Sequence, residues 1–367
     1  MQEHSSFFLK VGGQMKTRKR RRKRYRLKLR FYIIVTLTLL LLIALGYGIF
    51  SRLRPDPEPD VSSLSAAEVR QFNLEFRHPH HGRLYERDLE ALKAFIRNGF
   101  EFTRSYVLFD ADVTLDLRSR YAILVNLTTG EVIYERNADA RAYPASLTKM
   151  MTVLVGLENA TADILPVHAD FVELFLANAS IAGFTNGEYV TLNDVLYAVM
   201  LPSGADATST LAYHVAGSYE GFVQLMNQRA KELGLDNTNF ANASGLHHDD
   251  HYTTARDMAV LVRLALLNPE FRAIFSARSY LTEMGTQLLF TSRMFDRLES
   301  PFFDGGEILG GKTGFTLEAL LCLASFATDG VYEYALITMY AEGGPFTLQY
   351  HVLDAVDAYQ YFLGNNN

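Results

Sequence analysis

The sequence predicts an α/β (α+β) protein with one antiparallel sheet flanked by helices and an all-helical region. Two observations indicate this fold class: strand patterns occur at both ends of the region after residue 113, and helical patterns fill residues 148–275 between them. Such an order indicates one sheet assembled from distant segments. The composition, with 49% hydrophobic and 21% charged residues, is typical of a globular protein.

The individual elements follow in chain order. The runs AILVNL and EVIYER, at residues 122–127 and 131–136, are rich in β-forming residues and are separated by a TTG turn, so they predict two paired strands. Helical patterns then cover residues 190–201, 205–217, 221–234 and 253–266. Strand patterns return at residues 279–284, 287–292, 319–330 and 332–341, and a last helix is expected at 347–363.

Charge divides the chain into two unlike parts. Residues 1–54 carry 14 Lys/Arg and one Glu, and because the whole chain has a net charge of −6, the remainder carries −19. The basic block 16–30 could by itself bind nucleic acid. However, the next twenty residues, 31–50, hold no charge and match the roughly 30 Å thickness of a bilayer core. We therefore predict a single-pass membrane protein with no nucleic-acid partner.

The positive charge flanks only one side of the apolar segment, so the N-terminus should be cytoplasmic and the rest extracellular. A cleaved signal peptide is the alternative, but it has a shorter apolar region and an A-x-A-like cleavage site, which SRLRPDPEPD does not offer. The prolines of PDPEPD begin a stiff linker. We expect a basic cytoplasmic segment at 1–30, a transmembrane anchor at 31–50, a linker or stalk at 51–112 and a folded domain at 113–367.

Cysteine and histidine give weak signals for metal. The one cysteine, Cys322, excludes an internal disulfide and a thiolate zinc site, and the apolar run LLCLASF around it favours a buried packing residue over a reactive thiol. The histidines of RHPHHGR, at residues 78–81, lie beside Pro and Gly, which favours an exposed turn over a metal site.

The segment 143-YPASLTKMMTVLVGLE-158 places a lysine in what looks like a buried helix, where an ammonium group is costly unless it is paired or used. Ser146 and Lys149 are three residues apart and so share one helix face. A lysine whose pKa is lowered by its surroundings can take the serine proton and create a nucleophile, and the N–H groups at a helix start favour an oxyanion. By itself S-x-x-K is a weak signal, because solvent-facing lysines are common.

Two later stretches of the sequence strengthen the prediction that Ser146 is a nucleophile. In 201-LPSGADAT-208, Ser203 lies in a turn between two helical runs, and in 309-LGGKTGFT-316, Lys312 lies between glycines before a strand. GGKTG lacks the spacing of a phosphate-binding loop and leads into a strand, so that alternative is disfavoured. S-x-x-K, a serine turn and K-T-G, in this order, form the signature of penicillin-recognising serine enzymes.

Over roughly residues 118–340, the sequence resembles the low-molecular-weight penicillin-binding proteins that are serine-type D-alanyl-D-alanine carboxypeptidases. The stretches TGEVIYERNADARAYPASLTKMMT, NTNFANASGLHHDDHYTTARDMAVL and ILGGKTGFT carry the likeness beyond the three motifs. The resemblance implies a β-lactamase/transpeptidase-like fold and a catalytic domain at 113–367. It also implies that the enzyme trims D-alanine from peptidoglycan stem peptides outside the cell, needs no metal or cofactor, and is acylated by β-lactams.

The resemblance further implies catalytic roles for three residues. Ser146 would attack the carbonyl between two D-alanines, Lys149 would accept its proton, and Ser203 would relay a proton to the leaving amine. The substrate-binding residues would be Lys312, Thr313, Gly314 and Phe315. In this set the lysine and threonine would hold the terminal carboxylate, and the N–H groups of Ser146 and Phe315 would form the oxyanion hole.

Two departures from the family pattern stand out. The middle motif is usually S-x-N, but here it is Ser203-Gly204-Ala205. A lost amide contact costs about 1–3 kcal/mol of transition-state stabilisation, or roughly ten- to a hundredfold in rate, so we expect an active but altered enzyme. Leu320 stands where the family more often has glycine, and we expect this to affect packing.

Other interpretations stay open. A catalytically weakened peptidoglycan-binding protein would fit Ala205, and a β-lactamase or an endopeptidase could share the fold. A class A β-lactamase would need a general-base glutamate, for which no convincing segment is evident. The cluster HHDDH at 247–251 resembles zinc ligands, but its place within the family-like stretch favours a loop at the rim of the active site.

Overall fold

The computed structural model describes residues 102–104 and 115–364. No helix within these residues is both long and apolar enough to cross a bilayer. The expected cytoplasmic segment 1–30, the anchor 31–50 and the histidines of 78–81 lie outside the described residues, as does almost all of the linker 51–112.

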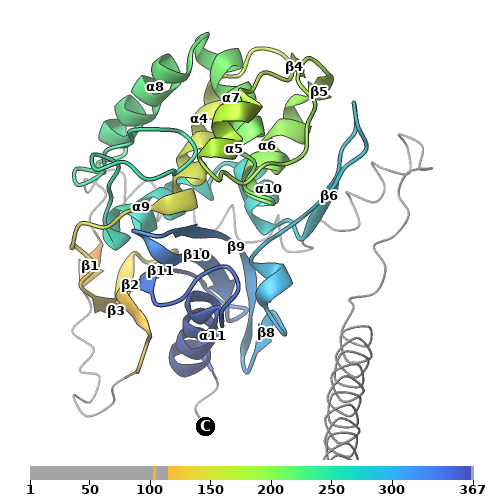
Figure 1. Cartoon of the computed structure of the whole chain (residues 1–367). Helices are drawn as coiled ribbons and strands as arrows, with labels where there is room; N and C mark the ends of the chain where they lie inside the picture. The colour runs from red at the N-terminus through yellow and green to blue at the C-terminus, as the bar shows by residue number, and fades with distance from the viewer. Residues whose placement is uncertain (1–101, 105–114, 365–367) are drawn as a thin grey trace, which may run out of the picture. The chain divides into compact units, whose positions relative to one another are not determined.

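In the described part of the chain, seven strands form the main sheet in the order β1-β3-β2-β11-β10-β9-β8 (Figure 1). All neighbouring pairs are antiparallel except the two-residue β1, which lies parallel to β3. Early and late segments meet at the centre, where Ile123 of β2 lies opposite Ile337 of β11. The strands are β1 (Thr103–Arg104), β2 (Ser119–Asn126), β3 (Glu131–Arg136), β8 (Phe302–Phe303), β9 (Gly306–Thr316), β10 (Leu320–Thr328) and β11 (Glu333–Ala341).

Helices from the middle of the chain form a separate layer on one side of this sheet, and the last helix packs on the other side (Figure 1). Local signals fix several helix ends: Thr191 and Asp194 form a capping box on α6, and Gly217 ends α7 with a φ of +70°. The helices are α4 (Lys149–Asn159), α5 (Phe171–Leu176), α6 (Leu192–Met200), α7 (Ala205–Ala216), α8 (Tyr219–Glu232), α9 (Ala255–Ala265), α10 (Pro269–Ser276) and α11 (Tyr350–Leu363).

The sheet separates two hydrophobic cores, because successive strand residues point to opposite faces. On β10, Ala324 and Phe326 pack in the larger core with the middle helices, while Leu323 and Ala327 pack in the smaller core under α11. Both faces of β10 are therefore buried, which explains why its sequence is an apolar run instead of an alternating pattern.

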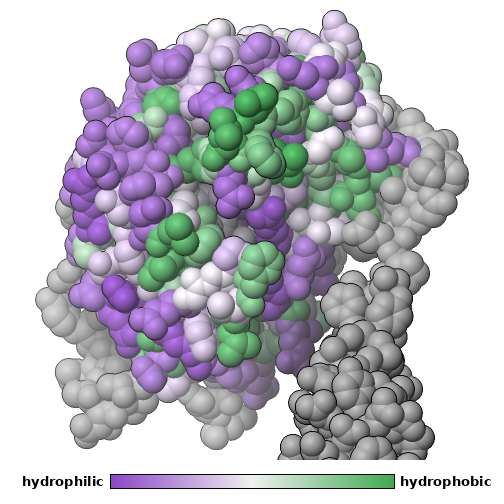
Figure 2. Space-filling view, viewed as in Figure 1, coloured by the Kyte–Doolittle hydropathy of each residue, from purple (hydrophilic) through white to green (hydrophobic). Residues whose placement is uncertain are grey.

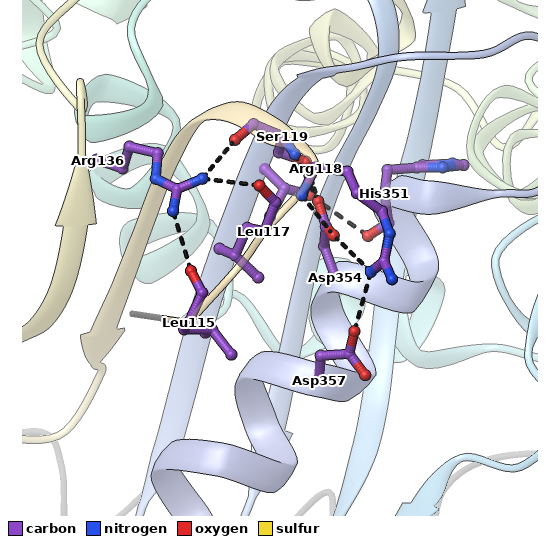
Figure 3. A network of polar contacts seen from close by, with 9 residues as sticks. Leu115, Leu117, Arg118, Ser119, Arg136, His351, Asp354 and Asp357 are labelled. Atoms are coloured by element: carbon purple, nitrogen blue, oxygen red, sulfur yellow. Dashed lines mark hydrogen bonds and ion pairs between the residues drawn. The ribbon is translucent and has the colours of Figure 1, made fainter. Parts of the chain in front are cut away.

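A polar network attaches α11 to the start of β2 (Figure 3). The buried Asp354 accepts hydrogen bonds from the backbone N–H groups of Arg118 and Ser119 at 3.0 and 2.7 Å and from the Ser119 hydroxyl at 2.6 Å. On β3, Arg136 donates to the carbonyls of Leu115 and Leu117 at 3.0 and 2.7 Å. These contacts hold the chain that enters the sheet against its last helix.

The predicted hairpin, the four predicted middle helices, the two late strands and the last helix are all present. The predicted strands at 279–284 and 287–292 are also present, but they form a separate two-stranded sheet, β6 (Ser279–Leu281) and β7 (Leu289–Thr291). A further pair, β4 (Ile164–Pro166) and β5 (Tyr189–Thr191), was not predicted because it lies in the region that we assigned to helices. We expected the lysine of K-T-G to lie before a strand. That prediction was wrong, because Lys312 lies within β9.

Candidate active site

Ser146 lies in a short 3₁₀ turn, η1 (Ala145–Thr148), that runs directly into α4. Pro144 caps this turn with a φ of −74°, a value that its ring favours. Lys149 is the first residue of α4, and its Nζ donates one hydrogen bond to Ser146 Oγ at 3.5 Å and another to the carbonyl of Ser244. The serine and the lysine thus face each other, as their spacing predicts.

The backbone around Ser146 is held tightly between two other segments. Ala145 has a φ of +46°, in the left-handed region that few non-glycine residues adopt. A Cβ atom at Gly245 would clash with the carbonyl of Ala145, and a Cβ atom at Gly314 would come within 3.0 Å of the Ser146 nitrogen. Glycine at both positions therefore lets the loop after Ser244 and strand β9 approach the serine turn closely.

The amine of Lys149 is poised to be neutral near neutral pH. The side chain is only 2% exposed, and this burial, together with the nearby positive charge of Arg293, lowers the pKa of Lys149 to about 7. The carboxylate of Asp206 partly opposes this shift. Asp206 itself accepts backbone N–H groups of the segment 182–184, so its charge is held in place.

Ser203 occupies the predicted turn between α6 and α7. Its φ of +68° is unusual for a residue with a side chain, and the residue is 2% exposed. Its Oγ has no hydrogen-bond partner among the described residues. A buried hydroxyl without a partner is costly, so this group is available to bond a molecule that enters the site.

Strand β9 places Lys312, Thr313 and Gly314 beside the serine turn. Lys312 is 1% exposed and donates to the carbonyl of Thr313 at 3.1 Å. Burial is the largest cause that lowers the pKa of Lys312 well below its ordinary value, and three neighbouring cations, Lys149, Arg293 and Arg297, lower it further. Lys312 therefore lies in a region with an excess of positively charged groups, and none of the neighbours that shift its pKa is a carboxylate.

Two arginines that the sequence analysis did not predict complete this cationic region. Arg297 Nη1 donates to Thr313 Oγ1 at 3.2 Å, and Arg293 Nη1 donates to Ser180 Oγ at 2.9 Å. Burial lowers the pKa of both guanidinium groups. The only signal in the sequence is the four-residue spacing of the two arginines in RMFDR, before the β9 motif.

A pocket of about 390 Å³ opens at Ser146 on the side of these arginines. It brings together Ser146, Ser203, Thr313, Gly314 and Phe315 of the predicted site. A smaller pocket of about 60 Å³ shares Ser146 and Asn178 with it, and Lys149 and Ala205 are part of its wall. Lys312 lines neither pocket.

The rim of the larger pocket carries exposed apolar groups. Phe346, which is fully exposed, lines this pocket together with Phe315. Helix α5, none of whose residues lines this pocket, exposes Val172, Phe175 and Leu176. Figure 2 shows apolar side chains gathered in separate groups on this face, one of them over the helical region. The entrance can therefore make apolar as well as charged contacts.

Ala205, the departure from the S-x-N pattern, is the first residue of α7 and is buried against Leu174 and other apolar groups. Its backbone N–H donates to the carbonyl of Ser180 at 2.7 Å. Another amide is nearby, because Asn178 lines both pockets that meet at Ser146. Sequence reasoning did not predict Asn178, which lies 27 positions before Ala205 in a segment without a recognisable motif.

The histidines of the HHDDH cluster differ in their burial and in their contacts. The buried His251 accepts the N–H of Ala241 at Nδ1 (2.9 Å), so its Nε2–H donates to Thr148 Oγ1 at 2.6 Å, and burial lowers the pKa of His251 to about 3. His247 instead lies within 3.9 Å of Glu318. Within the described residues, no group of three or more His, Cys, Asp or Glu side chains could hold a metal ion.

Cys322 is buried in the larger core, where burial raises the pKa of its thiol to about 12. A thiol in this environment stays protonated and inert. This agrees with the packing role that its apolar sequence context predicts. Leu320 has a φ of +54°, so the departure from glycine there affects the backbone and not only packing.

Known proteins share this fold. The solved structure of the Streptomyces K15 DD-transpeptidase matches with a TM-score of 0.60 and 26% identity, over 68% of this chain and 98% of that protein. A D-alanyl-D-alanine carboxypeptidase from Mycobacterium tuberculosis H37Rv matches with a TM-score of 0.59 and 26% identity, over 69% and 94% of the two chains. The mixed fold with an antiparallel sheet is therefore that of the DD-peptidases.

Sequence comparison agrees. The D-alanyl-D-alanine carboxypeptidase DacF of Bacillus subtilis is 36% identical over 221 residues, which are 58% of this chain and 54% of DacF. DacC of Escherichia coli is 33% identical over 252 residues, 64% of this chain and 60% of DacC. The chain thus spans about half the length of the curated relatives that it matches. The pattern of peptidase family S11 matches residues 109–343. The chain belongs to this family, the D-alanyl-D-alanine carboxypeptidases.

Proposed function

We propose that this protein is a serine-type D-alanyl-D-alanine carboxypeptidase that removes the terminal D-alanine from peptidoglycan stem peptides. One observation carries the proposal: Ser146 Oγ lies 3.5 Å from the buried amine of Lys149, whose pKa is lowered to about 7. A neutral amine at this distance is a base for the hydroxyl.

The terminal carboxylate of the peptide binds on the side of β9. Thr313 offers a hydroxyl there, Arg297 donates to that hydroxyl, and the amine of Lys312 donates to the carbonyl of Thr313 on the same strand. Charge-assisted hydrogen bonds of this kind are the strong ones. This end of the pocket therefore selects a peptide with a free C-terminus, as a carboxypeptidase must.

Acylation follows from this placement. Lys149 takes the proton of Ser146, and Oγ attacks the carbonyl carbon between the two D-alanines. The N–H groups of Ser146 and Phe315 stabilise the negative oxygen of the tetrahedral intermediate. Ser203, which lines the same pocket, relays the proton that Lys149 took to the leaving nitrogen, so that Lys149 is neutral again. The C–N bond breaks, D-alanine leaves, and the remaining peptide stays on Ser146 as an ester.

Water completes the cycle. The neutral Lys149 takes a proton from a water molecule, which attacks the ester carbonyl, and the C–O bond to Ser146 breaks. The serine regains a proton, and the shortened peptide leaves with a new carboxylate. β-Lactams enter the same sequence of steps, because they present a strained amide at the position of the scissile bond, and they acylate Ser146.

The test is acylation by a fluorescent penicillin, followed by intact mass on the full-length protein beside Ser146→Ala. We expect an adduct on the wild-type protein, none on the variant, and release of free D-alanine from a pentapeptide by the wild-type protein alone. An adduct that persists in Ser146→Ala would contradict the assignment of the nucleophile.

A second candidate function rests on Ala205. Without an amide at this position the protein could bind stem peptides and turn them over poorly, as a peptidoglycan-binding protein. Folded wild-type protein that binds the pentapeptide but forms no penicillin adduct would favour this candidate.

We also propose that residues 31–50 anchor the protein in the cell membrane, with residues 1–30 in the cytoplasm and the catalytic domain outside. The uncharged segment and its one-sided basic flank support this. In intact spheroplasts, external protease should digest a C-terminal epitope and spare an N-terminal one. The reverse pattern would contradict the orientation.

A further inference from the structure

Ala205 offers the substrate no amide, in contrast to the asparagine of the S-x-N pattern. Its methyl group packs in a small apolar cluster with Ala169 and Leu174, and the residue is only 2% exposed. A side chain of carbon and hydrogen cannot bond a peptide group. If the site binds its substrate through an amide, that amide comes from another segment of the chain.

The segment 178–180, which follows α5, is part of the wall of both pockets that meet at Ser146. The residues that line both pockets are Ser146, Asn178, Ala179, Ser180 and Phe315. Among these five, only Asn178 carries a side-chain amide, a group that can donate as well as accept hydrogen bonds. A peptide that occupies both pockets therefore passes beside this amide.

The backbone of Asn178 is fixed, whereas its side chain is exposed. Its φ is +51°, in the left-handed region that asparagine tolerates better than most residues. The N–H groups of Asn178 and Ala179 donate to the carbonyls of Phe175 and Leu174 at 3.0 and 2.9 Å, which ends α5. Within the described residues, the side-chain amide of Asn178 makes no hydrogen bond, so it can bond a ligand.

Hydrogen bonds also attach this segment to the start of α7. The carbonyl of Ser180 accepts the N–H of Ala205 at 2.7 Å, and the carboxylate of Asp206 accepts three N–H groups from residues 182–184. On its other side, Ser180 Oγ accepts a hydrogen bond from Arg293 at 2.9 Å. The segment that carries Asn178 is thus held directly against the position where the S-x-N amide is missing.

We propose that Asn178 is a substrate-binding residue, whose amide donates a hydrogen bond to the carbonyl of the peptide bond before the scissile one. This role rests on the proposed function, which sets the direction of the peptide. Arg297 and Thr313, which receive the terminal carboxylate, line only the larger pocket, so the acyl half of the substrate extends toward the smaller one. Asn178 lies where the two pockets meet, and the end of α5 thereby supplies the amide that α7 lacks.

The test uses two penicillins that differ in this carbonyl group. Benzylpenicillin has an acylamido carbonyl at the place of the peptide carbonyl before the scissile bond, and 6-aminopenicillanic acid has none. Intact mass measures the second-order rate constant of acylation of the full-length protein by each compound. Asn178→Gly removes the amide, and glycine readily keeps the left-handed backbone. We expect this variant to react about five- to tenfold more slowly with benzylpenicillin, and within about twofold of the wild-type rate with 6-aminopenicillanic acid.

Asn137→Gly is the matched control. Asn137 is also an exposed asparagine in the left-handed region, with a φ of +49°, and it lines neither pocket at Ser146. Its side chain donates to the carbonyl of Arg120 at 3.1 Å, so this variant loses a hydrogen bond far from the substrate. Both acylation rates should stay at the wild-type values.

The outcomes separate the role of Asn178 from the proposed function. Equal losses with the two penicillins, or no loss with either, would overturn the role of Asn178 even if the wild-type protein releases D-alanine. A loss confined to benzylpenicillin would support it even if no D-alanine is released from a pentapeptide, in which case the proposed enzymatic function would be wrong. Folded wild-type protein that reacts with neither penicillin would overturn both.

Discussion

Two lysines, Lys149 and Lys312, are almost completely buried near Ser146, and their surroundings differ. Lys149 has two hydrogen-bond acceptors, Ser146 Oγ and the carbonyl of Ser244, and Asp206 is near enough to raise its pKa against the effect of burial. The pKa of the Lys149 amine is therefore about 7, so that the amine can accept a proton near neutral pH.

Around Lys312 the charges are all of one sign. It donates to the carbonyl of Thr313, and every charged neighbour that shifts its pKa is a cation, including Arg293 and Arg297. The comparison teaches that burial alone does not set the role of a lysine. A nearby acceptor and a carboxylate suit a base, whereas an excess of cations suits a receptor for an anion that the substrate brings.

The largest expected effect follows from removing the base. Lys149→Ala should lower the rate of acylation by penicillin about 10³-fold, within the range for loss of a general base. Stopped-flow fluorescence measures the rate, and near-ultraviolet circular dichroism checks that the variant is folded. A loss of less than tenfold in folded protein would mean that another group takes the serine proton.

Removing Lys312, which we propose binds the terminal carboxylate, should lower the activity less than removing Lys149 does. Lys312→Met should lower kcat/KM for a peptide with a free C-terminus about ten- to a hundredfold, which corresponds to a charged hydrogen-bonding group worth about 1.5–3 kcal/mol. The control substrate is the same peptide with a C-terminal amide, on which the variant and the wild type should differ little. An equal loss on both substrates would argue against a role in binding the carboxylate.

The pH dependence of the acylation rate tests whether the neutral amine of Lys149 is the base. Because the neutral form of Lys149 is the base, the rate should be low in acid, rise through about pH 7 and level off above it. Arg293→Gln removes a cation that lowers the pKa of Lys149, so the midpoint should move to higher pH. Lys231→Gln, an equal change of charge on the exposed end of α8, should leave the midpoint in place. An unchanged midpoint in Arg293→Gln would contradict this account.

The smallest effect concerns the support beneath Lys149. Thr148→Val removes the hydrogen bond to His251 and should lower the free energy of unfolding by about 1 kcal/mol. Urea denaturation measures this value, and Thr148→Ser, which keeps the hydroxyl, should retain most of the stability. If Thr148→Val keeps the stability of the wild type, the hydrogen bond to His251 does not stabilise the fold.

The sequence predicted the regular elements well because their signals are local. The TTG turn, the periodicity of the helices and the three motifs around Ser146, Ser203 and Lys312 all lie in short segments. The strand β9 was one exception, since the glycines around Lys312 resemble a loop, and the short pair β4 and β5 was another. In the structure, glycine is needed there because the strand packs directly against the serine turn.

What the sequence could not predict depends on contacts between distant segments. Arg293 and Arg297 lack a motif, and they meet Thr313 and Ser180 only through the fold. The left-handed backbone at Leu320 is likewise invisible in an apolar run. A cavity that residues of α5, the start of α8 and Ala205 line together also depends on segments that no local pattern brings together.

The close packing around the serine turn means that Ser146 can be acylated only in the folded protein. Ser146 is shaped by Gly245 and Gly314, which lie about a hundred and more than a hundred and sixty positions away in the chain. A partly folded chain cannot bring these three segments together. Covalent labelling by penicillin along a denaturant series should therefore fall in step with the fraction of native protein.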